Sequence, residues 1–249
     1  MGGRIDCYVD ICSFYSYIIF LDILQNRSLL KSHSVTVEFH PILLGAINAG
    51  SGNKPPWALP AKAIYGLYEG RRVLGRFPLV PIQFPADLMS VSLTVLPLRA
   101  LHFIKRTYPD PEVFTTTLHY FFHSFWAPPN VNMTRPENVA KALSEVPAVF
   151  NGISVGSAAS DRRLFSKQEV EAIMNGAGFQ EMKDLLKETT QRALDQGAFG
   201  APWLWATNDA GVSEPFFGSD RFHFVYKFLG LPYQDVALLP PTDENKAKL

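Results

Sequence analysis

Residues 4–16 decide the fold, and they read RIDCYVDICSFYS. Residues 4–9 alternate between the two faces of an extended chain and include β-branched and aromatic side chains, which predicts a strand. Residues 13–28 place apolar side chains on one helical face, which predicts a helix. A second alternating run at 34–39 predicts another strand. The chain therefore opens as strand–helix–strand, with parallel pairing and a right-handed crossover.

The middle of the chain has a different pattern. A loop rich in proline and glycine occupies residues 50–56, and from about residue 61 the periodicity is mostly helical and repeatedly broken by prolines. Strand signals return at 203–207 and 214–217 with a hairpin signal between them, and a closing helix is expected over 220–229. Without the helical stretch, the order of elements is β-α-β followed by β-β-α.

That order is typical of one fold class. We predict an α/β protein with a thioredoxin-like βαβ–ββα domain that carries a large all-helical insertion. The thioredoxin-like domain is discontinuous and is expected over residues 1–60 plus 190–232. The insertion is expected over 61–189, and residues 233–249 are expected to form a C-terminal tail.

The composition is that of a globular protein, since 47% of the 249 residues are hydrophobic and 18% are charged. Lys plus Arg and Asp plus Glu number 23 each, so the formal net charge is zero. A neutral chain gives no electrostatic reason to expect nucleic acid or an anionic membrane as a partner. The longest apolar run, residues 11–21, is too short to cross about 30 Å of hydrocarbon. We therefore expect neither a nucleic-acid nor a membrane partner.

Ser13 and Ser16 stand where the first strand turns into the first helix. Backbone N–H groups at a helix N-terminus favour an anion such as a thiolate. Redox enzymes of this fold class carry Cys-x-x-Cys here, but serine cannot form a disulfide. The Ser13 hydroxyl could instead donate a hydrogen bond to a thiolate, which at about 1.5–3 kcal/mol would lower a thiol pKa by about one to two units. The alternative is that Ser13 only caps the helix.

Two later segments could complete a site. Pro202 precedes a predicted strand, where proline often marks a tight turn that is sometimes cis. In this fold class such a loop faces the active helix end, so the backbone of Ala201 would be free to pair with an extended peptide. Ser219 and Asp220 are N-cap residues by type and could bind a carboxylate or an ammonium group. Each segment also has a plain structural interpretation, as a strand entry and as a helix cap.

Other signals are weaker. Residues 152–156 match the Gly-x-Ser-x-Gly pattern of hydrolases but lack the flanking strand and helix that it needs. His119 and His123 have metal-ligand spacing on a helix, but the surrounding aromatic residues favour a packing role, and no metal is expected. Some aromatic side chains could line a second-substrate site or belong to the core: Trp57, Tyr65, Phe77 and Phe84.

Four segments together resemble the kappa-class glutathione transferases. They are SFYS at 13–16, SGNKPP at 51–56, GAFGAP at 197–202 and FGSDR at 217–221, in that family's order and at similar spacing. The resemblance covers about residues 4–232. It implies a DsbA-like architecture, in which a helical domain is inserted in a thioredoxin fold, and an enzyme that uses glutathione as co-substrate.

The resemblance also implies a role for each matching position. Ser13 would be the catalytic residue, stabilising the glutathione thiolate for attack on a small hydrophobic electrophile, with glutathione-dependent peroxidase activity as a further option. Asn53 and Lys62 would bind the glycine end of glutathione. Ala201 would pair with the cysteinyl backbone. The implied glutathione-binding residues are Ser13, Phe14, Tyr15, Asn53, Lys62, Ala201, Pro202, Ser219 and Asp220, the last two of them at the γ-glutamyl end.

The sequence departs from the family at two of these positions. Phe14 stands where the family usually has proline, which removes a constraint on the turn before the helix. Ala201 is smaller than the usual residue before the second proline. Because backbone contacts do not depend on that side chain, we expect a wider pocket with glutathione binding retained.

Two other functions share most of these features. Glutathione-dependent 2-hydroxychromene-2-carboxylate isomerases resemble the same family and share the Ser-x-x-Ser loop, although the complete SGNKPP loop favours the transferase. A non-catalytic thioredoxin-like module that binds extended peptides is the second alternative.

The last three residues resemble a peroxisomal targeting signal. Ala247-Lys248-Leu249 is similar to Ser-Lys-Leu, which predicts a peroxisomal location and the import receptor as a partner; mitochondrion and cytosol are the alternatives. A chance ending on a polar tail is the simpler interpretation of so short a match. The family resemblance further implies a homodimer.

Overall fold

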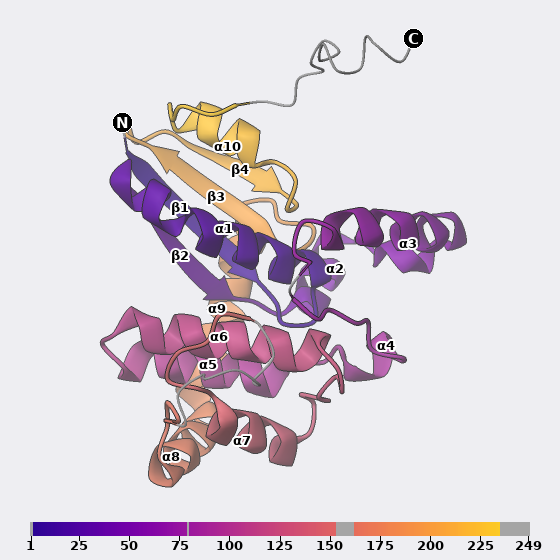
Figure 1. The fold of residues 1–249 in the computed structure, drawn as a ribbon, viewed down its shortest axis with the longest axis vertical. Helices are drawn as coiled ribbons and strands as arrows, with labels where there is room; N and C mark the ends of the chain where they lie inside the picture. The colour runs from indigo at the N-terminus through magenta and orange to yellow at the C-terminus, as the bar shows by residue number, and fades with distance from the viewer. Residues whose placement is uncertain (1, 79, 153–161, 235–249) are drawn as a thin grey trace, which may run out of the picture.

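The computed structural model describes residues 2–78, 80–152 and 162–234. Its sheet has four strands in the order β2-β1-β3-β4. β1 (Gly3–Val9) pairs in parallel with β2 (Val35–Pro41). β3 (Trp203–Asn208) is antiparallel to both β1 and β4 (Ser213–Phe217). The predicted order of strands and the α/β thioredoxin-like fold are therefore confirmed, and Figure 1 shows the sheet above a layer of helices.

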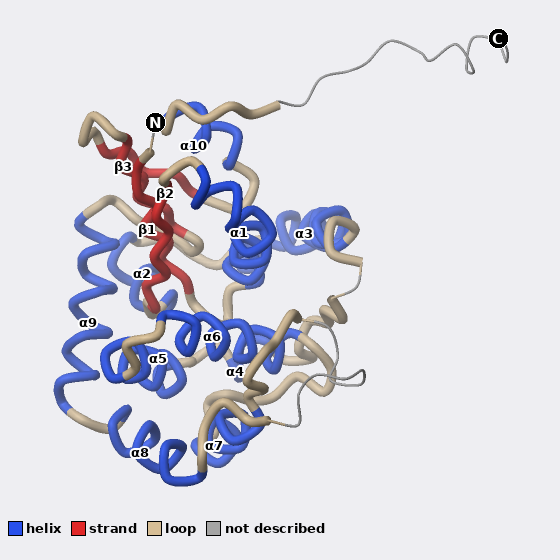
Figure 2. Tube along the Cα trace, turned by 60° about the vertical axis from the view of Figure 1, so that its left-hand side comes forward, coloured by secondary structure: helices blue, strands red, loops and turns tan. Residues whose placement is uncertain are grey.

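The two faces of the sheet bury different cores. Side chains alternate along a strand, so Ile5, Cys7 and Val9 join the larger hydrophobic cluster while Tyr8 joins a smaller one. The larger cluster contains α1 (Phe14–Ser32), and the smaller one contains part of α9 (Gln180–Asp195). Figure 2 shows these two helices on opposite sides of the strands.

Helix α1 connects the parallel strands β1 and β2. Almost every residue of its first ten is buried, as expected for a helix that is covered on several sides. The helix runs four residues beyond the predicted end at residue 28, because Leu29, Leu30 and Lys31 are good helix formers, and the chain turns away at Ser34, whose φ is +58°. The start at Ser13, which N-caps the helix, agrees with the prediction.

Helices fill the chain between β2 and β3, as predicted from about residue 61 on, but the first of them was not predicted and includes residues 50 and 51 of the expected loop. In chain order they are α2 (Leu44–Ser51), the 3-10 turn η1 (Pro56–Ala58), α3 (Pro60–Leu74), α4 (Leu88–Val91), α5 (Val95–Thr107), α6 (Pro111–Trp126), α7 (Pro136–Glu145), α8 (Lys167–Ala177) and α9. The larger hydrophobic cluster continues from the sheet into α5, α6, α7 and α8. Helix α3 projects away from this layer (Figure 1). The division of the chain into two domains stays a prediction.

Among the described residues, one stretch is long and apolar enough to cross a membrane by length and composition, Leu88–Thr107, with a hydropathy of 1.3. The chain divides it into α4 and α5. Leu98, Leu101 and Ile104 of α5 are fully buried against the protein. Helix α5 therefore packs one face into the core, and 39% of the most apolar window of the stretch is buried.

The closing helix begins later than predicted. It is α10 (Phe222–Phe228), its N-cap residue is Arg221, and no side chain caps it. Asp220 lies outside the helix, and its carboxylate accepts a hydrogen bond from the Arg221 guanidinium at 2.6 Å. The assignment of Ser219 and Asp220 as N-cap residues is therefore wrong. The predicted end is correct, because Gly230 has a φ of +68° and closes the helix with Leu231 in a Schellman motif.

Candidate functional site

Ser13 joins the start of α1 to a distant part of the chain. Its oxygen accepts a hydrogen bond from the backbone N–H of Ser16 at 3.2 Å, which is the cap, and its hydroxyl donates to the backbone carbonyl of Ala201 at 2.9 Å. The residue is 6% exposed. Capping therefore uses only the acceptor side of the hydroxyl, and the donor side points across to the loop before β3.

The turn before Ser13 is held by Asp10. The Asp10 backbone carbonyl accepts from the Ser13 N–H at 3.0 Å, and one side-chain oxygen accepts from the Cys12 N–H at 3.2 Å. The Thr94 hydroxyl and the Leu44 N–H, at the starts of α5 and α2, donate to the same carboxylate at 2.5 and 2.7 Å. Asp10 is fully buried, and burial raises the pKa of its carboxyl while these donors oppose the change. All of its partners are donors, which suits the ionised form.

A tryptophan holds the same turn from the other side. The Nε1–H of Trp126, at the end of α6, donates to the Ile11 carbonyl at 2.8 Å, and Trp126 is fully buried. Cys12 is also buried and, like Cys7, is free. The turn that positions Ser13 is therefore bonded to α2, α5 and α6, so the helical layer takes part in building the site.

The Ala201–Pro202 peptide bond is cis, as the sequence suggested. Within the part of the chain that is described, the Ala201 N–H has no hydrogen-bond partner. The Pro202 carbonyl accepts from the Gly218 N–H at 3.3 Å, which brings the segment Gly218-Ser219-Asp220 beside the same loop. Ser219 is 5% exposed, whereas Asp220 is exposed.

Asn53 reaches the loop before β3 from a different direction. Gly52 ends α2 in the left-handed conformation, with a φ of +74°, which turns the chain out of the helix. The side-chain amide of Asn53 then donates to the Phe199 carbonyl at 2.6 Å. Asn53 is exposed, so it lies at the surface near the loop that carries Ala201.

Tyr15 connects this region to α3. Burial raises the pKa of its hydroxyl, and the charges of Glu69, Asp220 and Tyr65 raise it further, so these groups lie near one another. Tyr65 and Glu69 follow Lys62 at helical positions i+3 and i+7, on one face of α3. Lys62 is exposed, and among the described residues no hydrogen bond or ion pair joins it to the predicted site. The structure thus groups the predicted residues except Lys62, which shares only the helix face.

Phe14 lies at the first position of α1 and is 7% exposed. Its ring packs against Phe84 and Trp126 with centroid distances of 4.9 and 5.7 Å. Phe84 is 46% exposed, so it presents an aromatic ring to solvent on top of Phe14, the residue that follows Ser13. Of the other aromatic candidates, Phe77 is buried in the core and Tyr65 is exposed on α3, while the Trp57 side chain is outside the described part.

Sequence reasoning missed several residues of this site. Asp10 is an acidic residue within an apolar segment, a signal that could have been noticed. The Trp126 indole and the Phe199 carbonyl act across more than a hundred residues of chain, and nothing local marks them. Glu69 could have been found only by placing α3 next to α1.

The weaker candidates from the sequence do not join the group of residues around Ser13. His119 is buried among aromatic rings that include Phe20 and Phe150, and burial lowers its pKa to about 3, which fits packing. Residues 153–156 of the Gly-x-Ser-x-Gly match lie outside the described residues, as does the 247–249 ending. Asp6, Glu38 and His40 lie within 4.8 Å of one another, but Arg4 and Lys105 pair with the two carboxylates.

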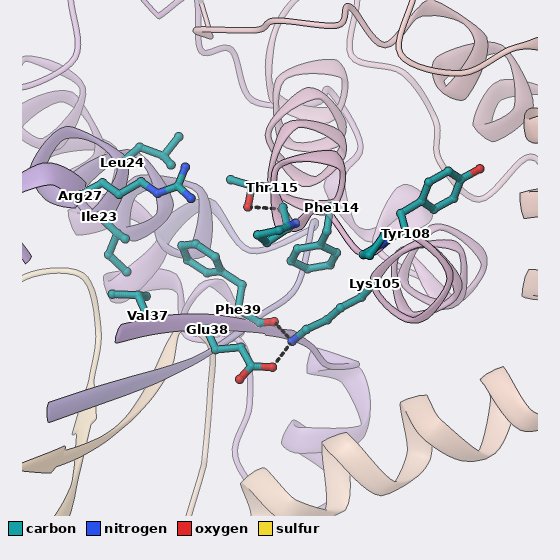
Figure 3. Close-up of a pocket in the computed structure, with 12 residues that line it drawn as sticks. Ile23, Leu24, Arg27, Val37, Glu38, Phe39, Lys105, Tyr108, Phe114 and Thr115 are labelled. Atoms are coloured by element: carbon teal, nitrogen blue, oxygen red, sulfur yellow. Dashed lines mark hydrogen bonds and ion pairs between the residues drawn. The ribbon is translucent and has the colours of Figure 1, made fainter. Parts of the chain in front are cut away.

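A cavity of about 270 Å³ lies between α1, β2, α5 and α6 (Figure 3). It is lined by the second half of α1, from Ile23 on, which is about 15 Å along the helix axis from Ser13. Its cations are already paired: Lys105 contacts Glu38 at 2.6 Å, and Arg27 contacts Glu112 at 2.7 Å. The cavity therefore presents mainly apolar groups and belongs to a different region from Ser13.

Comparison with known proteins gives a consistent result. The family described as DSBA-like thioredoxin domain matches residues 4–230. Glutathione S-transferase kappa 1 of Homo sapiens is 27% identical over 227 residues, which cover 91% of this chain and 90% of that protein. Its namesake from Caenorhabditis elegans is 27% identical over 231 residues, 92% of each chain. A solved 2-hydroxychromene-2-carboxylate isomerase shares the fold, with a TM-score of 0.66 at 16% identity over 91% of this chain and 94% of that one.

Proposed function

The chain belongs to the DsbA-like thioredoxin domain family, and from that premise we propose that it is a kappa-class glutathione transferase in which Ser13 stabilises the glutathione thiolate. Curated relatives with that activity in their name match it over about nine-tenths of their length. One observation carries the mechanism. The Ser13 hydroxyl stands at the N-terminus of a 19-residue helix, 2.9 Å from the carbonyl of the cis-proline loop.

The helix end suits a sulfur anion. In the described chain the backbone N–H groups of Phe14 and Tyr15 have no hydrogen-bond partner, and no acidic residue lies in the first turn. Unpaired N–H groups and the helix dipole favour a negative charge at this place. A hydroxyl donor adds about 1.5–3 kcal/mol in favour of the charged form. Together these groups would keep bound glutathione largely as thiolate near neutral pH.

The neighbouring groups suit the rest of the tripeptide. The unpartnered Ala201 N–H can pair with the cysteinyl backbone, and Asp220 is an exposed carboxylate that can bind the ammonium of the γ-glutamyl end. Asn53 and, from the same face of α3 as Tyr65, Lys62 would bind the carboxylate of the glycine end. Ser219 is buried at the bend before Asp220 and would contribute chiefly through its backbone.

The electrophile would lie against aromatic side chains. Phe84, which is 46% exposed, packs on the buried ring of Phe14, the residue that follows Ser13. Aromatic rings pack on such a surface at centroid separations of about 4.5–7 Å. A small hydrophobic, electron-poor aromatic compound is therefore the expected class of second substrate, with peroxides as the other class that a stabilised thiolate could reduce.

Substitution of Ser13 tests the proposal. In Ser13→Ala we expect the thiol pKa of bound glutathione to rise by about one to two units, so that turnover of a chloronitrobenzene at pH 7 falls about tenfold or more. Ultraviolet absorbance of the thiolate and steady-state kinetics measure the two effects. Ser32→Ala, at the opposite end of the same helix, is the control. Unchanged thiol pKa and turnover in Ser13→Ala would contradict the mechanism.

Two other activities can be separated directly. Isomerisation of 2-hydroxychromene-2-carboxylate with catalytic glutathione would indicate the isomerase, for which the structural likeness supports the fold alone. Absence of glutathione binding in calorimetry, together with binding of extended peptides, would indicate a non-catalytic module. The transferase proposal expects stoichiometric consumption of glutathione.

The assembly and location are proposals of the same kind. A homodimer follows from the resemblance to the kappa class, and sedimentation equilibrium measures it. The ending Ala247-Lys248-Leu249 is proposed to bind the peroxisomal import receptor. A fluorescent fusion that loses its peroxisomal pattern when Leu249 is removed supports this, and an unchanged cytosolic or mitochondrial pattern contradicts it.

A further inference from the structure

The direction of the hydrogen bonds at Ser13 is fixed by chemistry. The backbone N–H of Ser16 can only donate, and the backbone carbonyl of Ala201 can only accept. The Ser13 hydroxyl therefore accepts at 3.2 Å from Ser16 and donates its single proton to Ala201 at 2.9 Å. The proton that would stabilise a thiolate is thus already donated to a carbonyl of the chain itself.

This arrangement sets a condition for catalysis. A thiolate only accepts hydrogen bonds, so the Ser13 proton must turn away from Ala201 to reach a sulfur. Ala201 is 9% exposed, and a buried carbonyl left without a donor costs free energy of the same order as a hydrogen bond to a charged group gains. Rotation of the hydroxyl alone therefore gains little, unless another donor replaces it at the carbonyl.

Glutathione carries such a donor next to its sulfur. The amide N–H of its cysteinyl residue and the side chain that bears the sulfur are attached to the same α-carbon. An extended peptide beside Ala201 would direct this N–H to the Ala201 carbonyl. The Ala201 N–H, unpartnered in the described chain, would then donate to the substrate's own carbonyl, as in a single β-bridge.

We propose that the Ala201 carbonyl holds the Ser13 proton until the cysteinyl N–H of the substrate replaces it, and that this exchange turns the Ser13 hydroxyl towards the sulfur. The inference rests on the proposed function. The thiol proton leaves to bulk water and Ser13 keeps its own, so no covalent bond of the protein changes.

The exchange selects a class of substrate. The protein would activate thiols that carry an acylated amine on the carbon atom adjacent to the carbon that bears the sulfur. This amide must keep a free N–H. Simple thiols such as 2-mercaptoethanol lack this donor and would stay protonated near neutral pH. Ala201 is in this sense a positioning residue, since its carbonyl acts on the sulfur only through Ser13.

A different arrangement of the hydrogen bonds at Ala201 would change the thiol pKa in the opposite direction. A carbonyl oxygen has two lone pairs, so Ala201 could accept from Ser13 and from the substrate at once. The Ser13 oxygen would then offer only a lone pair to the sulfur, which favours the protonated thiol. Exchange lowers the thiol pKa on binding, whereas shared acceptance leaves it unchanged or raises it.

The experiment compares glutathione with two ester analogues. In one, an oxygen replaces the cysteinyl amide N–H; in the matched control, an oxygen replaces the glycyl amide N–H. Each thiol pKa is measured by ultraviolet absorbance at a concentration shown by calorimetry to saturate the protein. We expect the fall to be about one to two units larger for glutathione and for the control ester than for the cysteinyl ester, whose sulfur only the N-terminus of α1 would stabilise.

Ser13→Ala should reduce the fall for glutathione to that of the cysteinyl ester and change nothing for the cysteinyl ester. An equal fall with both esters overturns the exchange but leaves the proposed function standing. No fall with glutathione itself overturns the proposed function.

A crystal structure of the glutathione complex gives a second readout that does not depend on the analogues binding. The exchange expects the cysteinyl nitrogen within about 3.2 Å of the Ala201 oxygen, and Ser13 Oγ in hydrogen-bond contact with the sulfur instead of with Ala201. A complex in which Ser13 still donates to Ala201 overturns it.

Discussion

Phe14 directly follows Ser13, and its effect at the residue scale is to pack with other aromatic side chains. Its ring is covered by Phe84, which also packs against Trp126 at a centroid distance of 5.3 Å. The turn that a proline would restrain is instead held from outside, by the indole of Trp126 and by Asp10. Phenylalanine at position 14 therefore leaves the turn before Ser13 held by these bonds, and Phe84 adds an exposed aromatic ring beside Phe14.

Removal of the exposed Phe84 ring should raise the KM for the aromatic electrophile but not the KM for glutathione. In Phe84→Ala we expect the KM for an aromatic electrophile to rise about two- to tenfold, because an aromatic pair contributes about 0.5–1.5 kcal/mol. The KM for glutathione should stay the same, since none of its proposed contacts involves Phe84. Steady-state kinetics with each substrate varied in turn measure the split. Phe179→Ala, an exposed phenylalanine beside α9, is the control, and an equal rise of both KM values would contradict the assignment.

Asp22, a buried residue of α1, is expected to make the stability of the protein depend on pH. It is 4% exposed, and burial raises the pKa of its carboxyl to about 6 although Arg76 opposes this. The folded pKa exceeds the unfolded value of 3.8, so the folded state binds the proton more tightly. The contribution of Asp22 to stability is therefore present below about pH 4 and is lost as the pH rises to about 6, by roughly 2–3 kcal/mol.

Asp22→Asn removes this titration. Urea unfolding of both proteins between pH 4 and 7 measures it, and the variant's stability relative to the unsubstituted protein should rise across that interval. A constant difference between the two proteins would show that the carboxyl titrates alike in both states. Glu171→Gln, on the exposed face of α8, serves as the control and should show no such trend.

At the scale of elements, the buried carboxylate of Asp10 joins the starts of three helices. It accepts from the Cys12 N–H before α1, from Leu44 at the start of α2 and from Thr94 at the start of α5. Helix N-termini favour a negative charge, which explains how a fully buried carboxylate is accommodated without a cation among the described contacts. The same bonds fix the angle at which α1 leaves β1.

Removal of this carboxylate should be costly. In Asp10→Ala three donors lose their acceptor in the core, and we expect the free energy of unfolding to fall by about 3 kcal/mol or more. Denaturant unfolding measures it. Asp87→Ala, which removes an exposed carboxylate from the N-cap of α4, is the matched control and should cost about 0.5–2 kcal/mol. If the free energy of unfolding fell by a similar amount in the two variants, Asp10 would not be the acceptor that joins the three helices.

The same elements show which parts of the fold and of the site could be predicted from the sequence. The β1–α1 junction, the cis-proline loop and the order of strands depend on local patterns, so they could be predicted. The start of α10 could not, because Ser219 and Asp220 are N-cap residues by type, whereas the helix begins after Arg221 with no side-chain cap. The contacts of Trp126 with Ile11 and of Asn53 with Phe199 depend on packing between distant segments, which no local pattern encodes.

At the scale of the whole molecule, the sheet and the helical layer share one hydrophobic core. Phe122 of α6 is fully buried and stacks on Tyr17 of α1 at a centroid distance of 5.1 Å, and it also packs against Phe20 at 5.4 Å. Side chains of β1, α1, α5 and α6 belong to the same cluster. The turn before Ser13 is bonded to α2, α5 and α6. The site therefore depends on the folding of both the sheet and the helical layer.

A shared core predicts that the two parts unfold together. Phe122→Ala should lower the free energy of unfolding by about 3–5 kcal/mol, as large-to-small changes of buried phenylalanine do. Because Phe122 packs on α1, peptides from β1 and β3 should lose hydrogen-exchange protection at the same lowered urea concentration as peptides from α5 and α6. Mass spectrometry of exchange at increasing urea measures both at once. Phe179→Ala should leave both midpoints almost unchanged. If only the helical peptides shifted in Phe122→Ala, the layers would be separate cooperative units, and the bonds from Trp126 and Thr94 would not be enough to couple the Ser13 turn to the helical layer.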